Sequence, residues 1–294
     1  MYYQKIALGV AACALVSTLL DSTPLNAARH NWTAEAREPF QHTFSNDKTL
    51  DVDNIDGAIQ VIGDNGSTIR VEGEKIIRAL DQQALDRAKR EVQLDVNEKD
   101  GVAQLYVNGP FRNNGRSSSD HGFHVHFDGQ EYEVTYNFTV HVPRETALQL
   151  RTVNGEVKTG DTRGRFDIHD VNGSITMTGL AGSGTLRTVN GPTTVSFREI
   201  PRAACEFHTV NGPIDASFPP NLAADLRIKT LNGQAYTDFE AAAPPSAAAT
   251  TSRSRNGRFV YKSDRHTDVR IGAGGPQLSF ETVNGDIRIR KGVL

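Results

Sequence analysis

The sequence predicts an all-β protein, a single-chain β-solenoid with 18–21-residue rungs and one short helix near its N-terminal end. Two observations favour this class. The tripeptide Val-Asn-Gly, or a close variant, recurs along the second half of the chain. In addition, only 37% of the residues are hydrophobic, whereas 26 are glycine. A solenoid buries a thin core and exposes most of each rung, so this composition is typical of it.

The first residues have the order of a secretory signal. Lys5 supplies a positive charge, an uncharged apolar run covers 6–20, and a stretch of small and polar residues ends near Ala27 or Ala28. We therefore expect a signal peptide over 1–27, no membrane span after its cleavage, and an exported protein that is periplasmic, secreted or at the cell surface. The context of Cys13 resembles a lipoprotein box, so cleavage, lipidation and retention as an anchor all stay open.

The predicted solenoid domain covers 40–294, and its N-terminal part, 40–146, holds the helix and a loop insertion. An early copy of the repeat is centred on Asp56-Gly57. The segment 78–92 predicts an amphipathic helix that packs beside the first rungs or covers an end of the solenoid. Its apolar residues recur every four positions, at Leu80, Ala84, Ala88 and Val92.

Regular rungs are predicted over 147–294, with a low-complexity insertion at 241–257 inside the longest interval. The copies carry apolar residues six, four and one positions before the Asn and three positions after it. Thr stands two positions before the Asn in five of six copies, and Asp170 is the exception. The predicted turn ladder consists of Asn154, Gly155, Asn172, Gly173, Asn190, Gly191, Asn211, Gly212, Asn232, Gly233, Asn284 and Gly285.

The local pattern explains the prediction. Alternating apolar residues form strands with one inward face, and Asn-Gly is a favoured turn pair. A meander of β-hairpins has the same period and is the alternative. Recurrence of identical residues favours the solenoid, because stacked Asn side chains bond their neighbours. Cys205 occupies an apolar position of the repeat, which predicts a small buried hydrophobe rather than a reactive thiol.

One outward position of the repeat carries basic or titratable side chains in five copies and Glu281 in the sixth. It lies three residues before the Asn. This row predicts a track for an anionic polymer, such as an acidic surface polysaccharide or another envelope component. A solvated face is the alternative, and the net charge of −3 argues against nucleic acid as a partner. The row consists of Arg151, His169, Arg187, His208 and Lys229.

No catalytic motif is present in the sequence, so we expect no enzyme and no cofactor. His121, His124 and His126 are weak candidates for a metal site, with three solvated histidines as the alternative. The expected function is non-catalytic binding or scaffolding at the cell envelope. A carbohydrate-active enzyme on a β-helix, either a polysaccharide lyase or a hydrolase, is one alternative. A scaffold that self-associates through the solenoid ends is the other.

Several of these segments resemble one family. The run 136–143, the Leu-Gln-Leu-Arg-Thr-Val-Asn-Gly segment at 148–155, the Thr-Val-Asn-Gly and Asp-Val-Asn-Gly rungs and the signal peptide resemble the bacterial putative adhesin domains. That family has no established function and is related to other β-solenoid surface domains. The resemblance covers roughly 40–294 and implies no catalytic residues. The insertion at 241–257 and the His-rich segment 121–126 depart from it.

Overall fold

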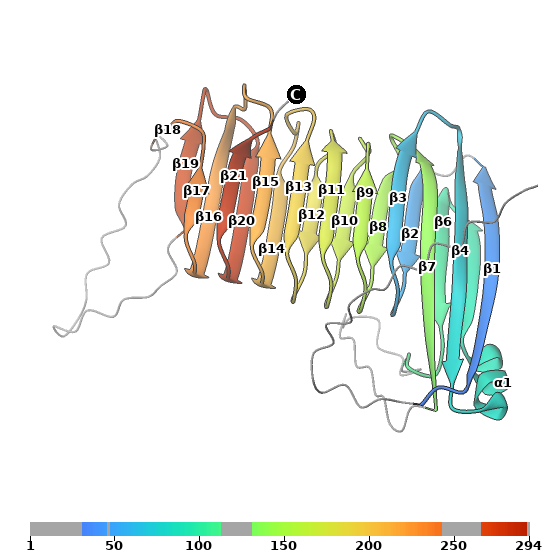
Figure 1. Cartoon of the computed structure of the whole chain (residues 1–294). Coiled ribbons are helices and arrows are strands. Elements are labelled where there is room, and N and C mark those ends of the chain that lie inside the picture. The colour runs from blue at the N-terminus through green and yellow to red at the C-terminus, as the bar shows by residue number, and fades with distance from the viewer. Residues whose placement is uncertain (1–30, 46–47, 113–130, 243–265, 293–294) are drawn as a thin grey trace, which may run out of the picture. The chain divides into compact units, whose positions relative to one another are not determined.

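The computed structural model describes residues 31–45, 48–112, 131–242 and 266–292 (Figure 1). The predicted signal peptide, the candidate metal ligands His121, His124 and His126, and most of the insertion at 241–257 lie outside these residues. Residues from Trp32 onward belong to one compact unit, which is described here by itself.

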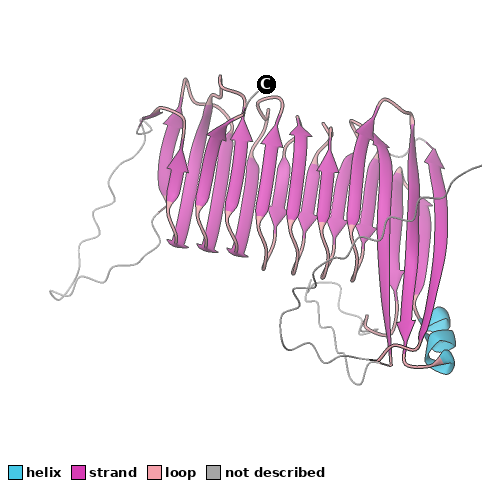
Figure 2. Ribbon diagram, viewed as in Figure 1, coloured by secondary structure: helices cyan, strands magenta, loops and turns pink. Residues whose placement is uncertain are grey.

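Nearly all of the regular structure in the described residues is β-strand (Figure 2). The strands form a 10-stranded sheet, sheet A, and an 11-stranded sheet, sheet B. In spatial order, sheet A contains β1 (Ala34–Ser45), β4 (Thr68–Ala79), β7 (Tyr132–Pro143), β3 (Ile59–Asp64), β9 (Val157–Gly160), β11 (Ile175–Leu180), β13 (Thr193–Phe197), β15 (Ile214–Phe218), β21 (Ile287–Lys291) and β17 (Ala235–Thr237). Sheet B contains β18 (Ala241–Ala242), β19 (Thr267–Ile271), β16 (Ala224–Asn232), β20 (Gln277–Asn284), β14 (Cys205–Asn211), β12 (Gly184–Arg187), β10 (Phe166–His169), β8 (Ala147–Arg151), β2 (Thr49–Asp53), β6 (Val102–Asn108) and β5 (Gln93–Lys99).

Each copy of the repeat places its first strand in sheet B and its second strand in sheet A, with the Asn-Gly turn between them. Neighbouring copies pair in parallel, and equivalent residues lie opposite each other. Phe166 of β10 lies opposite Leu148 of β8 and Gly184 of β12, for example. Parallel pairing excludes the meander of hairpins for this part of the chain, because a hairpin joins antiparallel strands.

The copies do not follow one another in space as they do in sequence. The last copy, made of β20 and β21, lies between β14 and β15 on one side and β16 and β17 on the other. Strand β19 then pairs with the outer edge of β16 in the antiparallel direction. The copy that is fifth in sequence is therefore sixth in the stack.

The predicted fold class requires a correction. The chain is all-β with one helix in its described part, but it is not a single-chain β-solenoid. It consists of two large sheets that are mixed, because antiparallel strands join both ends of the parallel stack. Neither sheet closes on itself. The alignment of the copies does not contain this information, because strands β1, β4, β5 and β19 fall outside the copies.

The N-terminal part of the two sheets is antiparallel. Strands β1, β4 and β7 form a ribbon of long strands in sheet A, and β5 pairs with β6 at the edge of sheet B. Helix α1 (Gln82–Glu91) packs against this ribbon through Ala84, Leu85 and Ala88. The helix is shorter than the predicted 78–92, because Arg78 and Ala79 still belong to β4, and Leu80 is 38% exposed.

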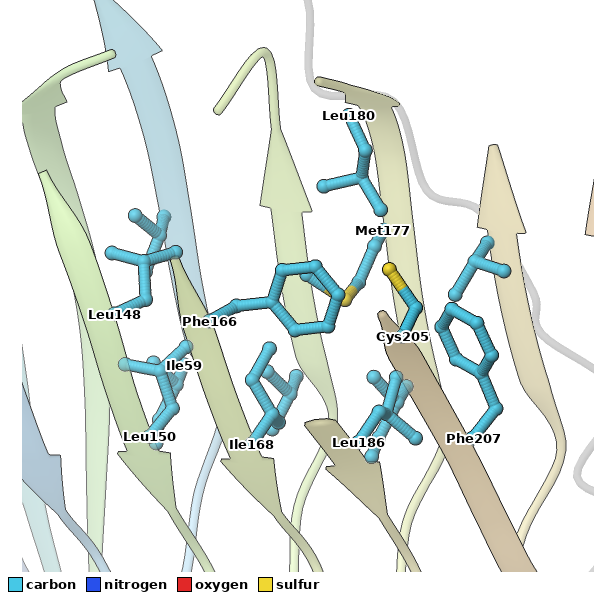
Figure 3. Packing of buried hydrophobic residues seen from close by; sticks show 14 of the residues in the cluster. Ile59, Leu148, Leu150, Phe166, Ile168, Met177, Leu180, Leu186, Cys205 and Phe207 are labelled. Atoms are coloured by element: carbon cyan, nitrogen blue, oxygen red, sulfur yellow. The ribbon is translucent and has the colours of Figure 1, made fainter. Parts of the chain in front are cut away.

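The hydrophobic core lies between the two sheets and includes side chains from both. Figure 3 shows residues such as Leu148, Phe166 and Phe207 of sheet B directed toward the same interior as Met177 and Leu180 of sheet A. Aromatic rings stack along the rows: Phe207 lies 5.1 Å from Phe280, centroid to centroid. Each fully buried large side chain stabilises the fold by about 1.5–3 kcal/mol relative to an exposed one.

Cys205 is part of this core. Its side chain is 1% exposed, and burial raises the pKa of its thiol. It lies opposite Leu278 of β20, which fills the same position of the repeat. The prediction of a small buried hydrophobe is confirmed.

Candidate functional site

The candidate site is the outer face of sheet B, where most of the predicted row lies on consecutive strands. Arg151, His169, Arg187 and His208 come from β8, β10, β12 and β14, and they lie opposite one another in that order. The residue before each of them along the strand is buried, so the alternation of a β-strand directs these side chains outward. With a strand spacing of ~4.8 Å, the row repeats one basic or titratable group per strand.

The row is shorter than the sequence predicts. Because β20 lies between β14 and β16, Glu281 separates His208 from Lys229. Glu281 Oε1 lies 2.8 Å from Lys229 Nζ, and Glu281 Oε2 lies 3.5 Å from His208 Nδ1. The hydrogen bond from Lys229 lowers the pKa of Glu281. Lys229 is therefore not continuous with the other four members of the row.

Carboxylates stand beside the basic row, two residues earlier along the strands. They neutralise part of the charge of Arg151 and Arg187, and Glu206 lies beside both Arg187 and His208. Ion pairs between exposed side chains contribute about 0–1 kcal/mol each, so they organise the face more than they stabilise the fold. The separations are Arg151 Nη1–Asp51 Oδ1 3.1 Å, His169 Nε2–Asp167 Oδ1 3.0 Å, Arg187 Nη2–Glu206 Oε2 3.4 Å and His208 Nε2–Glu206 Oε2 3.6 Å.

Sequence reasoning missed one basic residue of this face. Arg112 follows β6 and reaches back over the face: its Nη2 lies 2.8 Å from Asp53 Oδ1, and its Cζ lies 4.1 Å from the centre of the Tyr106 ring. Asp53 lies opposite both Arg151 and Tyr106, so Arg112 extends the charged row beyond β8. No sequence signal would have found it, since its position depends on how the chain turns after β6.

The predicted turn ladder is a continuous chain of side-chain hydrogen bonds along the edge of this face. Every Asn donates through Nδ2 to the Oδ1 of its neighbour, and all bonds run in one direction. The chain ends at Asp56, whose pKa is raised by burial and lowered to a smaller extent by the bond from Asn154. Donor to acceptor, the bonds are Asn232–Asn284 2.7 Å, Asn284–Asn211 2.7 Å, Asn211–Asn190 2.8 Å, Asn190–Asn172 2.8 Å, Asn172–Asn154 3.0 Å and Asn154–Asp56 2.6 Å.

The glycines of the ladder are required by close stacking. A Cβ on Gly173 would lie 1.7 Å from the carbonyl oxygen of Gly155, and the other turn glycines meet their neighbours in the same way. Most of them have no positive φ. Turn geometry, which the sequence analysis used to explain the glycines, is therefore the lesser reason. The Asn and Gly residues build the stack rather than a ligand site.

The two positions before each Asn differ in exposure. The Thr row points inward, with Thr152, Thr188 and Thr209 each at most 4% exposed. The residue directly before the Asn is exposed in three copies: Val189 is 39%, Val210 39% and Leu231 58% exposed. The alternation of the preceding strand could have predicted the inward Thr, since it shares its parity with the apolar positions four and six residues before the Asn.

Within the described ranges, no group of three or more His, Cys, Asp or Glu side chains is placed to hold a metal ion. Among the described residues, no helix is long and apolar enough to cross a membrane. The three histidines proposed as weak metal ligands lie outside the described residues, so that prediction stays untested.

No protein-family model matches this chain. No curated protein matches it significantly either. Solved structures with some likeness include a putative cell adhesion protein from Clostridium sporogenes, with 9% identity, a TM-score of 0.40, and coverage of 87% of this chain and 100% of its own. A putative adhesin from Bacteroides fragilis has 12% identity, a TM-score of 0.37, and coverage of 86% and 97%.

A third solved structure, a putative lipid binding protein from Parabacteroides distasonis, has 11% identity and a TM-score of 0.22, with coverage of 87% of this chain and 97% of its own. At these identities and TM-scores, the likenesses carry no inference about ligand or binding residues. The structural neighbours include bacterial proteins that are described as putative adhesins or as a putative cell adhesion protein.

Proposed function

We propose that this chain is a non-catalytic, adhesin-like binding protein of the cell envelope, and that the outer face of sheet B from β8 to β14 is its binding surface. The observation that carries the proposal is the placement of Arg151, His169, Arg187 and His208 on four consecutive parallel strands. A polymer with regularly spaced anionic groups, such as an acidic polysaccharide, matches such a face because both partners are periodic.

The neighbouring carboxylates set how such a polymer would bind. Each basic group is partly neutralised, so each contact is weak, and affinity comes from many contacts along one polymer chain. Binding of this kind decreases as salt increases, because exposed charges are screened over about 10 Å at 0.1 M salt. Export is part of the proposal, and the order of charge, apolar run and small residues at 1–27 supports it.

The test uses pectate and heparin as probes, at low and at physiological ionic strength. The double variant R151A/R187A is expected to bind roughly fivefold more weakly at low salt, if each arginine contributes about 0.5 kcal/mol. The single variant E206Q is expected to bind more tightly, because it removes a negative charge that neutralises Arg187 and lies 3.6 Å from His208. The two variants are expected to change affinity in opposite directions. Damage to the fold would weaken binding in both, so the pair distinguishes it from recognition of charge.

The matched control is R163A/R198A, which removes two exposed arginines that lie off this face. They pair with Glu199 and Asp161 in the segments that connect the copies. The control is expected to bind as the unmodified protein does. If R151A/R187A and R163A/R198A weaken binding equally, or if E206Q has no effect, the outer face of sheet B is not the binding surface.

A further inference from the structure

Asp170 is a carboxylic acid in the interior of the parallel stack. It is 4% exposed, and neither of its carboxyl oxygens has a hydrogen-bond partner of normal geometry. It holds the inward position two residues before Asn172, which is Thr in the other five regular copies. A buried carboxylate without a partner is costly, so this exception calls for a physical explanation.

Two threonines of the same row show what this position does. Thr230 Oγ1 donates to the carbonyl oxygen of Gly285 at 2.9 Å, and Thr282 Oγ1 donates to that of Gly212 at 3.1 Å. In both cases the acceptor is the turn glycine of the neighbouring copy. The hydroxyl of Thr230 and the carbonyl of Gly285 both lie close to Gly233. A Cβ on Gly233 would be 1.9 Å from Gly285 O and 2.9 Å from Thr230 Oγ1. In these two copies the inward hydroxyl is a donor, whereas the hydroxyls of Thr152, Thr188 and Thr209 have no hydrogen-bond partner.

Asp170 stands where these threonines stand. A Cβ on Gly173 would lie 1.7 Å from the carbonyl oxygen of Gly155 and 2.7 Å from Asp170 Oδ2. The carboxyl oxygen and the Gly155 carbonyl therefore lie about as close to the Cβ position of Gly173 as the Thr230 hydroxyl and its acceptor lie to that of Gly233. An ionised carboxylate can only accept hydrogen bonds, whereas a protonated one can donate. Only the protonated form can donate to the Gly155 carbonyl oxygen as Thr230 donates to that of Gly285.

The side chains that flank Asp170 along the inward row do not favour its ionised form. Its neighbours in the row, on the β8 and β12 sides, are the uncharged Thr152 and Thr188, and both are buried. The charged and titratable residues of the adjoining strands, Arg151 and Arg187, lie on the outer face instead.

Burial raises the pKa of Asp170 to about 7, and the amide groups of Val171 and Asn172 act in the opposite direction with less effect. No charged side chain contributes to the shift. The amide of Asn172 also donates to the carbonyl oxygen of Val153 at 2.7 Å, so it is already engaged within the stack.

We propose that Asp170 binds a proton in the folded protein and donates it to the carbonyl oxygen of Gly155, so that β8 and β10 are fully joined at this turn only while the carboxyl group is protonated. The proposal makes this turn a proton-dependent contact in the middle of the stack. It is independent of what the outer face of sheet B binds.

The sign of the pH dependence follows from the direction of the shift. The folded protein holds this proton up to about pH 7, whereas an unfolded chain releases it near its ordinary pKa of ~3.9. The contribution of Asp170 to stability is therefore complete below about pH 4, decreases as pH rises to about 7, and changes little above that.

The experiment measures denaturant unfolding of the full chain at about pH 5 and about pH 8. We compare it with D170N, whose amide can donate at every pH, and with D170T, which restores the residue of the other copies. The unmodified protein is expected to lose roughly a hundredfold in its folding equilibrium constant relative to D170N between the two pH values. The control D167N removes a carboxylate of the same strand that pairs outward with His169, and it should keep the loss.

Identical pH dependence in the unmodified protein and D170N would overturn the proposal. A second measurement covers the case in which a variant does not fold. Carbon-13 spectra of the unmodified protein labelled in its aspartate carboxyl groups should contain one carboxyl signal that titrates near pH 7. If every aspartate signal titrates below about pH 5, Asp170 is ionised in the fold and the proposal is wrong.

Discussion

The parallel stack and the antiparallel ribbon of β1, β4 and β7 join their strands by different means. In the stack, equivalent residues of the repeat lie opposite one another, so one Asn ladder and one glycine row run through all the regular copies. In the ribbon, no residue pattern repeats from strand to strand, and pairs such as Arg37–Glu74, 3.2 Å apart, occur once. A change in the stack is therefore felt by both neighbouring copies, whereas a change in the ribbon stays local.

The largest effect expected from this difference is that of G173A in the stack. Its Cβ would lie 1.7 Å from the Gly155 carbonyl oxygen, so the backbone of one of these two turns would have to move. We expect a loss of about 3 kcal/mol or more in the free energy of unfolding, measured by denaturant titration. The control is G160A, whose Cβ would meet nothing closer than 3.7 Å and should change stability by less than about 1 kcal/mol. Equal losses in both variants would contradict the role of close stacking.

A smaller effect is expected from breaking the Asn ladder. N190A removes one donated and one accepted side-chain bond, both 2.8 Å long, and should cost about 2 kcal/mol. Its counterpart in the antiparallel part is N108A, which removes a single exposed bond of 3.1 Å to Asp95 and should cost less than about 1 kcal/mol. If N108A proves as costly as N190A in the same titration, the ladder adds nothing beyond its separate bonds.

The smallest effect is expected at helix α1, which packs on the ribbon. The Asp81 carboxylate caps the helix by accepting a 2.7 Å hydrogen bond from the amide of Ala84, and D81A should cost about 1 kcal/mol. Hydrogen exchange should become faster in α1 and stay unchanged in β8–β15. The control D86A removes only an exposed bond to Gln82 and should leave exchange in both regions as it is. Faster exchange throughout the stack would show that the two regions are coupled.

Alignment of the copies predicted which residues would face each other, because identical residues at fixed offsets stack only in register. Pairs such as Leu148 and Phe166 do lie opposite each other. The order of the copies could not be predicted, since the edge of one copy offers the same hydrogen bonds as the edge of any other. The antiparallel ribbon could not be predicted either, because its strands share no residue pattern with the copies.

The sequence does not determine the order of the copies in space, and this explains which parts of the candidate site it could predict. Four members of the basic row were predicted correctly as neighbours, since their copies follow one another both in sequence and in space. Lys229 was misplaced because β20 enters the stack before β16. Arg112 was missed because a loop positions it.

The order of the copies has a consequence for how the chain folds as it is made. The described partners of β16 are β19 and β20, and the described partner of β17 is β21. All three are encoded after the strands that they complete. Residues 224–237 therefore lack the strands that they pair with in the folded protein until residues 267–291 have been synthesised. The stack can grow with the chain up to β15, and its last two copies reach their final pairing only after both have been synthesised.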